Sequence, residues 1–233
     1  MPAYQPPKIS FTLSAPGLFQ GNPSYDDVEI TASDFPAAYQ IGWHDVWCAD
    51  RQTVLYTSAP YNIYTGATIY SSYEYNILRT NPDFATVGNN PGNTTSVSAL
   101  TGTTNQLLNT VPVDSLHPVQ PYLENLDIVN WLLNNSQVSP TTYSDTINGT
   151  IYSNIHYYTV TGVAGLFTFG DIEQTIYQLL GDGWSGNAFL GISNPTDVTT
   201  LVNALVSGSH EGYMPDVGEK IAVLLDSGSN PYI

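Results

Sequence analysis

The chain has 233 residues, of which 42% are hydrophobic and 12% aromatic, and its net charge is −16 because 20 acidic residues face only four basic ones. This charge excludes non-specific nucleic-acid binding, which needs clustered Lys and Arg, and it argues against docking on anionic lipid. The apolar content predicts a folded core and not a disordered chain, and no apolar run is long enough to insert into a membrane.

Charged residues make up only 10% of the chain, so uncharged Ser, Thr, Asn and Tyr must cover much of the surface. Such a surface is typical of exported proteins, and we expect an extracellular or cell-surface location. The N-terminus lacks a basic segment followed by an apolar stretch, so we expect a signal peptide to be absent or already removed. Cys48 is the only cysteine, which excludes an internal disulfide.

The first part of the chain predicts β-strands. Apolar residues alternate over 9–13, and Lys8 with the prolines nearby favours an edge position for this strand. Further strands are expected at 28–31, on either side of Ala49-Asp50 within 39–56, and at 68–73.

The second part of the chain predicts helices. An apolar stripe indicates a first helix over about 121–135. A second helix is expected to begin near Thr168, where Asp171 completes a pair that resembles a capping box, and Gly181 suits its C-terminal cap.

The last helix carries the clearest signals. Asn194 is expected to cap it, Pro195 suits its first position, and Gly208 is expected to end it. Residues 152–163 predict a hairpin before these two helices, and residues 221–226 predict a buried final strand.

This order predicts an α+β fold that is dominated by β structure, with a barrel-like or sandwich-like sheet and about three helices packed against it. We expect one compact module over 1–233, with two subdomains as an option. The first would cover about 1–115, mainly β with a long polar loop near 80–110. The second would cover about 116–233 and contain the helices, the hairpin and the final strand.

Common metal-binding and catalytic motifs are missing. No HExxH, CxxC, phosphate-binding or GxSxG pattern occurs, so no metal site and no cofactor are expected. Asp26, Asp27 and Glu29 could bind calcium, but we interpret them as solvated loop residues. The histidines are far apart in the chain: His44, His117, His156 and His210.

Cys48 is flanked by Trp47 and sits in a predicted strand. On strand geometry, Val46 and Cys48 share one face while Trp47 takes the other. A free cysteine is usually a small buried hydrophobe. Two interpretations of Cys48 therefore stay open: a buried, inert thiol and a chemically reactive thiol.

Several segments, in their order along the chain, resemble one family. They are Trp47–Asp50, Glu124–Asn134, Thr168–Tyr177, Ala204–Pro215 and Ile221–Asp226. Together they resemble bacterial cell-surface thioester domains and their relatives in larger exported adhesin-like proteins. The resemblance implies that a Cys and a Gln join as a buried thioester, which an amine on a host surface attacks to leave a covalent amide bond.

In such domains the Gln opens a helix in a pattern like Thr-Gln-x-Ala-Ile-Trp. Cys48 matches the family cysteine. Aligning Ile176-Tyr177 with the Ile-Trp of the pattern puts Glu173 at the glutamine position, and a carboxylate cannot form the thioester by losing ammonia. Gln174 follows, about 100° round the helix. The thioester candidates are therefore Cys48 with Gln174 or Glu173, and the surrounding aromatic residues are Trp43, Trp47 and Tyr177.

The expected function is adhesion to a host or neighbouring surface protein, with or without the covalent bond. The alternative is a structural subunit of a surface layer or extracellular filament, whose Pro-rich N-terminal strand pairs with a neighbour's sheet edge. We do not expect an enzyme. A carbohydrate hydrolase could use Asp50 and Glu173, but nothing in the sequence fixes two carboxylates at the needed separation.

Overall fold

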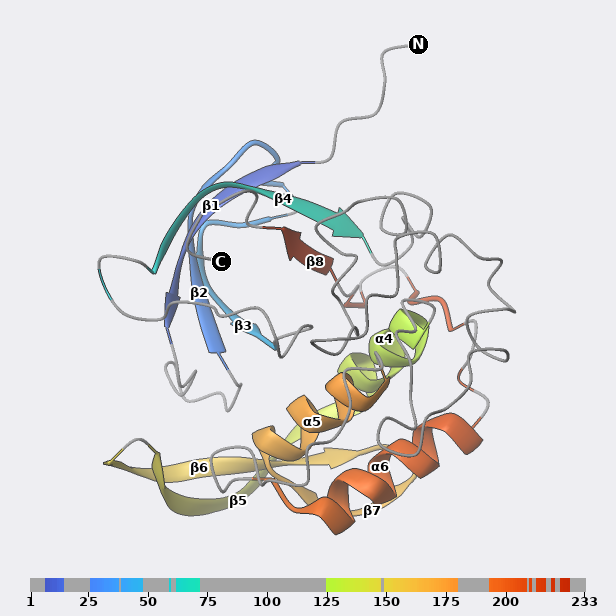
Figure 1. Cartoon of the computed structure of the whole chain (residues 1–233). Coiled ribbons are helices and arrows are strands. Elements are labelled where there is room, and N and C mark those ends of the chain that lie inside the picture. Colours follow the sequence, from blue (N-terminus) through green and yellow to red (C-terminus); the bar gives the residue numbers. More distant parts are fainter. Residues whose placement is uncertain are drawn as a thin grey trace, which may run out of the picture.

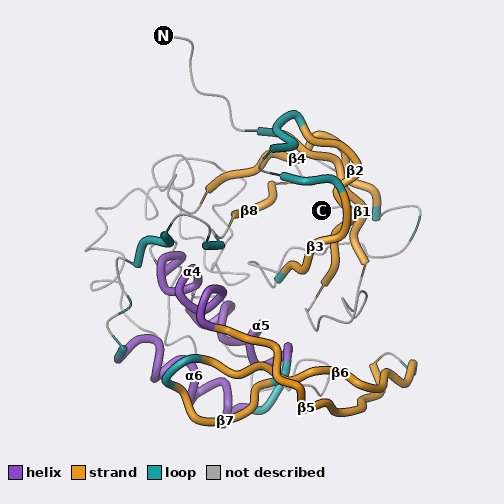
Figure 2. The backbone as a smooth tube through the Cα atoms, turned by 180° about the vertical axis from the view of Figure 1, so that it is seen from behind, coloured by secondary structure: helices purple, strands orange, loops and turns teal. Residues whose placement is uncertain are grey.

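The computed structural model describes residues 7–14, 26–37, 39–47, 59, 62–71, 125–147, 149–179, 193–208, 210, 213–216, 219–220 and 223–226. Within these residues the fold is α+β and dominated by β structure, as predicted, with two antiparallel sheets and three helices. One half of the molecule holds a five-stranded sheet (Figure 1). The other half holds the helices together with a three-stranded sheet, and the view from behind shows the same division (Figure 2). No helix in the described ranges is long and apolar enough to cross a membrane.

The five-stranded sheet has the order β3-β2-β1-β4-β8. It combines strands from the early and late parts of the sequence, because β8, the last strand of the described residues, pairs with β4 in antiparallel fashion. The strands are β1 (Lys8–Ser14), β2 (Asp26–Ser33), β3 (Gly42–Val46), β4 (Ile63–Ser71) and β8 (Val223–Asp226).

Strand β1 lies in the middle of this sheet and not at its edge, so the predicted edge position is wrong. It pairs with β2 on one side and with β4 on the other. The prediction failed because the nearby prolines fall outside Lys8–Ser14, so they remove no ladder N–H from the strand. A neighbouring molecule therefore cannot pair with β1 unless β2 or β4 leaves it.

The alternation of apolar and polar residues in β1 was predicted correctly. Its apolar residues contribute to the core of the five-stranded sheet. Ile9, Phe11 and Leu13 are buried on the same face. Phe11 stacks on Tyr64 of β4 with ring centroids 4.8 Å apart. The opposite face of the sheet carries the polar members of the alternation.

The three-stranded sheet has the order β5-β6-β7, and its strands are β5 (Ser136–Ile147), β6 (Thr150–Val160) and β7 (Val163–Phe167). Residues 152–163 were expected to form a hairpin by themselves, which is wrong: they form most of one long strand, β6, and the turn into β7, and β6 pairs with both β5 and β7. Strand β5 was not predicted, because Pro140 interrupts its pattern. The pairing with β6 shifts register between Val138 and Thr142, which accommodates this proline.

The helices are α4 (Leu126–Asn135), α5 (Phe169–Leu179) and α6 (Pro195–Ser207). Asn194 caps α6 as predicted, since its side chain accepts a hydrogen bond of 3.0 Å from the N–H of Thr196. Gly208 follows the last residue of α6, also as predicted. Several predictions fall outside the described residues: the loop at 80–110, the strand after Asp50, the first turn of the helix at 121–135, and the cap at Gly181.

The helical half has its own apolar core. Leu132 of α4, Ile172 of α5, Leu201 of α6 and Phe167 of β7 belong to it, and each is at most 1% exposed. Trp47, directly after β3, packs against this cluster although its strand belongs to the other sheet. This contact connects the two halves.

Candidate functional site

Helix α5 begins with a reciprocal capping box, as the sequence predicts. The N–H of Asp171 donates to Oγ1 of Thr168 over 3.1 Å, and the N–H of Thr168 donates to Oδ2 of Asp171 over 2.8 Å. Aspartate therefore does here what Glu or Gln usually does in this motif. The box fixes where the helix starts, and so it fixes the direction in which Glu173 and Gln174 leave the second turn.

Helix α5 is short, but it is buried on almost every side. Every residue from Phe169 to Tyr177 is buried, including two acidic residues and one glutamine. Glu173 is 0% exposed and Gln174 is 2% exposed. Burying such polar groups costs free energy unless they make specific interactions, so the first two turns of α5 form a polar patch inside an apolar core.

Asp171 shows how this patch is held together. Besides capping α5, its Oδ1 accepts a hydrogen bond of 2.6 Å from the N–H of Asn194, the residue that caps α6. Burial raises the pKa of Asp171 above its usual value, while the hydrogen bonds from Asn194 and Thr168 act in the opposite direction. The carboxyl of Asp171 thus fixes the starts of two helices relative to each other.

The other end of α5 is tied to α4. The side-chain amide of Asn125, just before α4, donates to the carbonyl of Leu179 over 2.7 Å, and Asn125 is buried. This bond satisfies one of the carbonyls that a helix leaves open at its C-terminus. Helix α5 is therefore fixed at both ends.

Trp47 brings the predicted cysteine strand to the helical half. Its indole ring meets Tyr158 of β6 edge-to-face, with centroids 6.5 Å apart. Val46 packs against the core of the five-stranded sheet, whereas Trp47 packs against the core that contains α5. The two residues therefore face opposite ways, as strand alternation predicts. Cys48, the next residue, lies outside the described residues.

Of the predicted aromatic residues, Tyr177 is 2% exposed and belongs to α5, whereas Trp43 is 38% exposed on β3. Trp43 pairs with Glu29, on the face of the sheet opposite to the buried Val28 and Ile30. The structure thus places Trp47 and Tyr177 in the helical half with Glu173 and Gln174, and it places Trp43 elsewhere.

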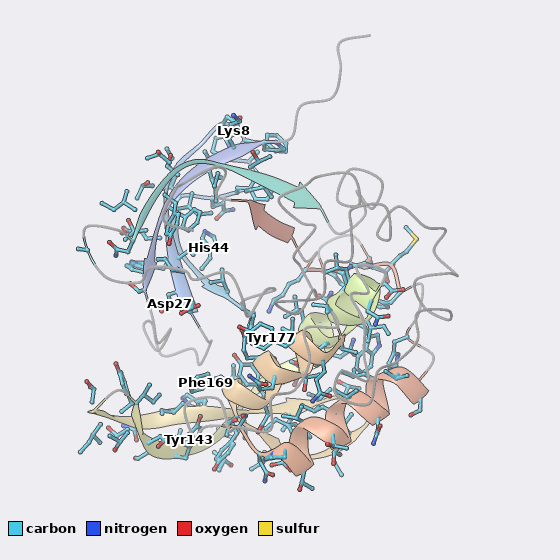
Figure 3. The ribbon with its side chains drawn as sticks, in the orientation of Figure 1. Lys8, Asp27, His44, Tyr143, Phe169 and Tyr177 are labelled. Atoms are coloured by element: carbon cyan, nitrogen blue, oxygen red, sulfur yellow. The ribbon has the colours of Figure 1, made fainter. Side chains whose placement is uncertain are left out.

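Three polar atoms in or near α5 are buried without a hydrogen-bond partner: the indole Nε1 of Trp47, the hydroxyl of Tyr143 and Oε2 of Glu173. Tyr143 belongs to β5, below α5 in Figure 3. Burial, above all, and then the charge of Asp145 raise the pKa of Tyr143. The phenol therefore stays protonated at physiological pH and can act only as a neutral donor or acceptor.

The acidic residues at 26–29 do not form a solvated loop, so that interpretation is wrong. They belong to strand β2, and Asp26 and Asp27 are each 2% exposed. The strand predicted at 28–31 was not extended back to Asp26 and Asp27, because acidic residues are disfavoured in strands. Across the described part of the chain, no group of three His, Cys, Asp or Glu side chains could hold a metal ion.

One contact of α4 was not expected from the sequence. His210 stacks on Trp131 with centroids 3.7 Å apart and the planes at 17°. Asn134, one turn later, donates to the carbonyl of Lys220 over 2.8 Å and accepts from its N–H over 2.7 Å. These contacts attach the connection between α6 and β8 to α4. The only sequence signal for these contacts is that Trp131 and Asn134 are three residues apart, which places them on one face of the helix.

No protein-family model, curated protein or solved structure matches this chain. Chemically, the first turns of α5 offer a carboxamide and a carboxyl that are shielded from water. An acyl group formed there would be protected from hydrolysis.

Proposed function

We propose that this chain is an exported bacterial cell-surface adhesion module of the thioester-domain type, in which Cys48 and Gln174 form the reactive bond. The observation that carries the proposal is the position of Trp47. Its side chain packs into the same core as the first turns of α5, and Cys48 follows it directly in the chain. The proposal requires the chain to turn after Trp47 so that the thiol reaches the helical half, because strand alternation alone would direct it to the side of Val46.

The choice between Gln174 and Glu173 follows from chemistry. The thiol sulfur attacks the side-chain carbonyl of Gln174, a C–S bond forms, the C–N bond breaks, and ammonia leaves with the thiol proton. Glu173 would have to lose water, and a carboxylate does not do so without activation. Both side chains are buried, which supports a site that keeps water away from the product.

The second step is the attack of an amine from the partner. The amine nitrogen forms a C–N bond with the acyl carbon, the C–S bond breaks, and the thiol regains a proton. An amide replaces a thioester, so attachment becomes covalent and resists force. A Lys side chain of a host or neighbouring surface protein would supply the amine.

Intact-mass measurement tests the proposal. The wild-type protein should be one ammonia lighter than its sequence, about 17 Da, and Cys48 should resist alkylation until methylamine is added. Gln174→Ala should restore the full mass and a reactive thiol. A wild-type protein with full mass and a freely alkylated Cys48 would remove the covalent form of the proposal.

The variant Glu173→Gln separates the two registers. If the helix presents position 173 to Cys48, this variant alone should show the mass loss, and the double variant Glu173→Gln with Gln174→Ala should keep it. If Gln174 is the partner, the double variant cannot form the thioester and should have its full calculated mass. The variant Glu173→Ala, which removes the carboxyl without adding an amide, is the control.

A further inference from the structure

A row of side chains crosses the outer face of the five-stranded sheet. Trp43 pairs with Glu29, Glu29 pairs with Thr12, and Thr12 pairs with Ile63. Directly paired residues point to the same side of a sheet. The neighbouring residues Phe11 and Tyr64 are buried, so this row lies on the face away from the core. Three strand spacings make the row roughly 14 Å long.

The row combines apolar ends with a polar middle. Trp43 is 38% exposed and Ile63 is 58% exposed, while Glu29 and Thr12 between them are half-buried. An entirely apolar partner would strip water from the carboxylate of Glu29 without replacing its hydrogen bonds, which is costly. The row therefore suits a partner with an aliphatic part and a positively charged end.

The charge of this face also favours a positively charged partner. Two positions after Trp43 on β3, Asp45 adds one further acidic position by register, whereas its partner Asp27 is 2% exposed and adds little to this face. Lys8 is the basic residue of β1 and lies four positions before Thr12, roughly 13 Å away along the strand. With 20 acidic and four basic residues in the whole chain, the field around the row attracts cations and repels anionic polymers.

We propose that the row Trp43–Glu29–Thr12–Ile63 docks a lysine- or arginine-bearing segment of a partner protein. The aliphatic stem of the basic side chain packs on Trp43 or Ile63, its charged end pairs with Glu29, and the indole face of Trp43 adds a cation–π contact. The choice of a protein partner rests on the proposed function, in which the partner supplies an amine. Docking here would raise the local concentration of such a partner before any covalent step.

Binding of a fluorescent lysine-rich peptide to the full chain tests this docking surface. The measurement is made on the wild type and on Cys48→Ala, which binds the peptide only reversibly. Trp43→Ala and Glu29→Gln should each weaken binding about threefold to fivefold, the range for exposed cation–π and ion-pair contacts. The same peptide with acetylated lysines, which keeps the stem but loses the charge, should not bind.

Asp216→Asn is the matched control, because it removes the same charge from an exposed residue outside the five-stranded sheet. If Glu29→Gln and Asp216→Asn weaken binding equally, only the net charge attracts the peptide and the row is not a site. Binding of a neutral oligosaccharide that depends on Trp43, with no binding of the peptide, also overturns the proposal. A full intact mass of the wild type would refute the thioester and leave the reversible binding result unaffected.

Discussion

At the scale of single residues, His210 couples the fold to pH. Its ring stacks on Trp131, and burial lowers its pKa below the usual value. Because the folded protein binds this proton less tightly than the unfolded chain, the contribution of His210 to stability is complete above the unfolded pKa of about 6.5. It is lost as the pH falls from there through the folded pKa.

We therefore predict that acidification from neutral pH lowers the melting temperature of the wild type more than that of His210→Phe. The phenyl ring keeps the stack but cannot take up a proton, so the difference between the two proteins isolates this residue. Melting curves at pH 7.5 and 5.5, followed by circular dichroism, measure it. Equal shifts in both proteins would show that the stack is indifferent to the charge of His210.

At the scale of elements, the helix starts could be predicted because their signals are local. Thr168 and Asp171 are three residues apart, and their side chains bond to each other's backbone. The position of β1 could not be predicted, since strand order depends on pairing between distant segments. Strand β5 was missed because Pro140 is tolerated only through a register shift with β6, which the sequence does not display.

The candidate site also has features that local sequence signals predict and features that depend on the tertiary fold. The register of Glu173 and Gln174 on their helix followed from the capping signals, and the helix is where the sequence predicts it. That this helix is buried all round did not follow, because a helix with several polar residues usually turns them toward solvent. The opposite faces of Val46 and Trp47 followed from strand alternation, whereas the exposure of Trp43 depends on which side of the sheet covers the core.

The cap of α6 gives a prediction at this scale. Asn194→Ala removes the side-chain acceptor of the Thr196 N–H, so it should destabilise the protein by about 1 kcal/mol. Urea denaturation measures the change. Asn203→Ala, at an exposed position within the same helix, is the control and should be neutral or slightly stabilising, because alanine has the higher helix propensity. Equal losses for both variants would contradict the role of the cap.

At the scale of the whole molecule, the two cores meet through few described contacts. Trp47 leaves the five-stranded sheet and packs into the core of the helical half, while β8 returns the chain from the helices to β4. The connection that precedes β8 is held on α4 by Asn134 and His210. The proposed site needs both cores in contact, since the cysteine follows β3 and the glutamine belongs to α5.

Trp47→Ala should therefore affect how the halves unfold together. Removing a fully buried tryptophan costs about 3–5 kcal/mol. Trp47 is only half-buried, so we expect a loss nearer 2 kcal/mol, together with a transition that no longer coincides between probes. Far-ultraviolet circular dichroism reports the helices, and near-ultraviolet circular dichroism reports the packed aromatic rings of both cores. Trp43→Ala, at an exposed position of β3, should change stability by at most about 0.5 kcal/mol. A single coincident transition in Trp47→Ala would mean that other contacts are enough to hold the cores together, and that the approach of Cys48 to α5 does not depend on this tryptophan.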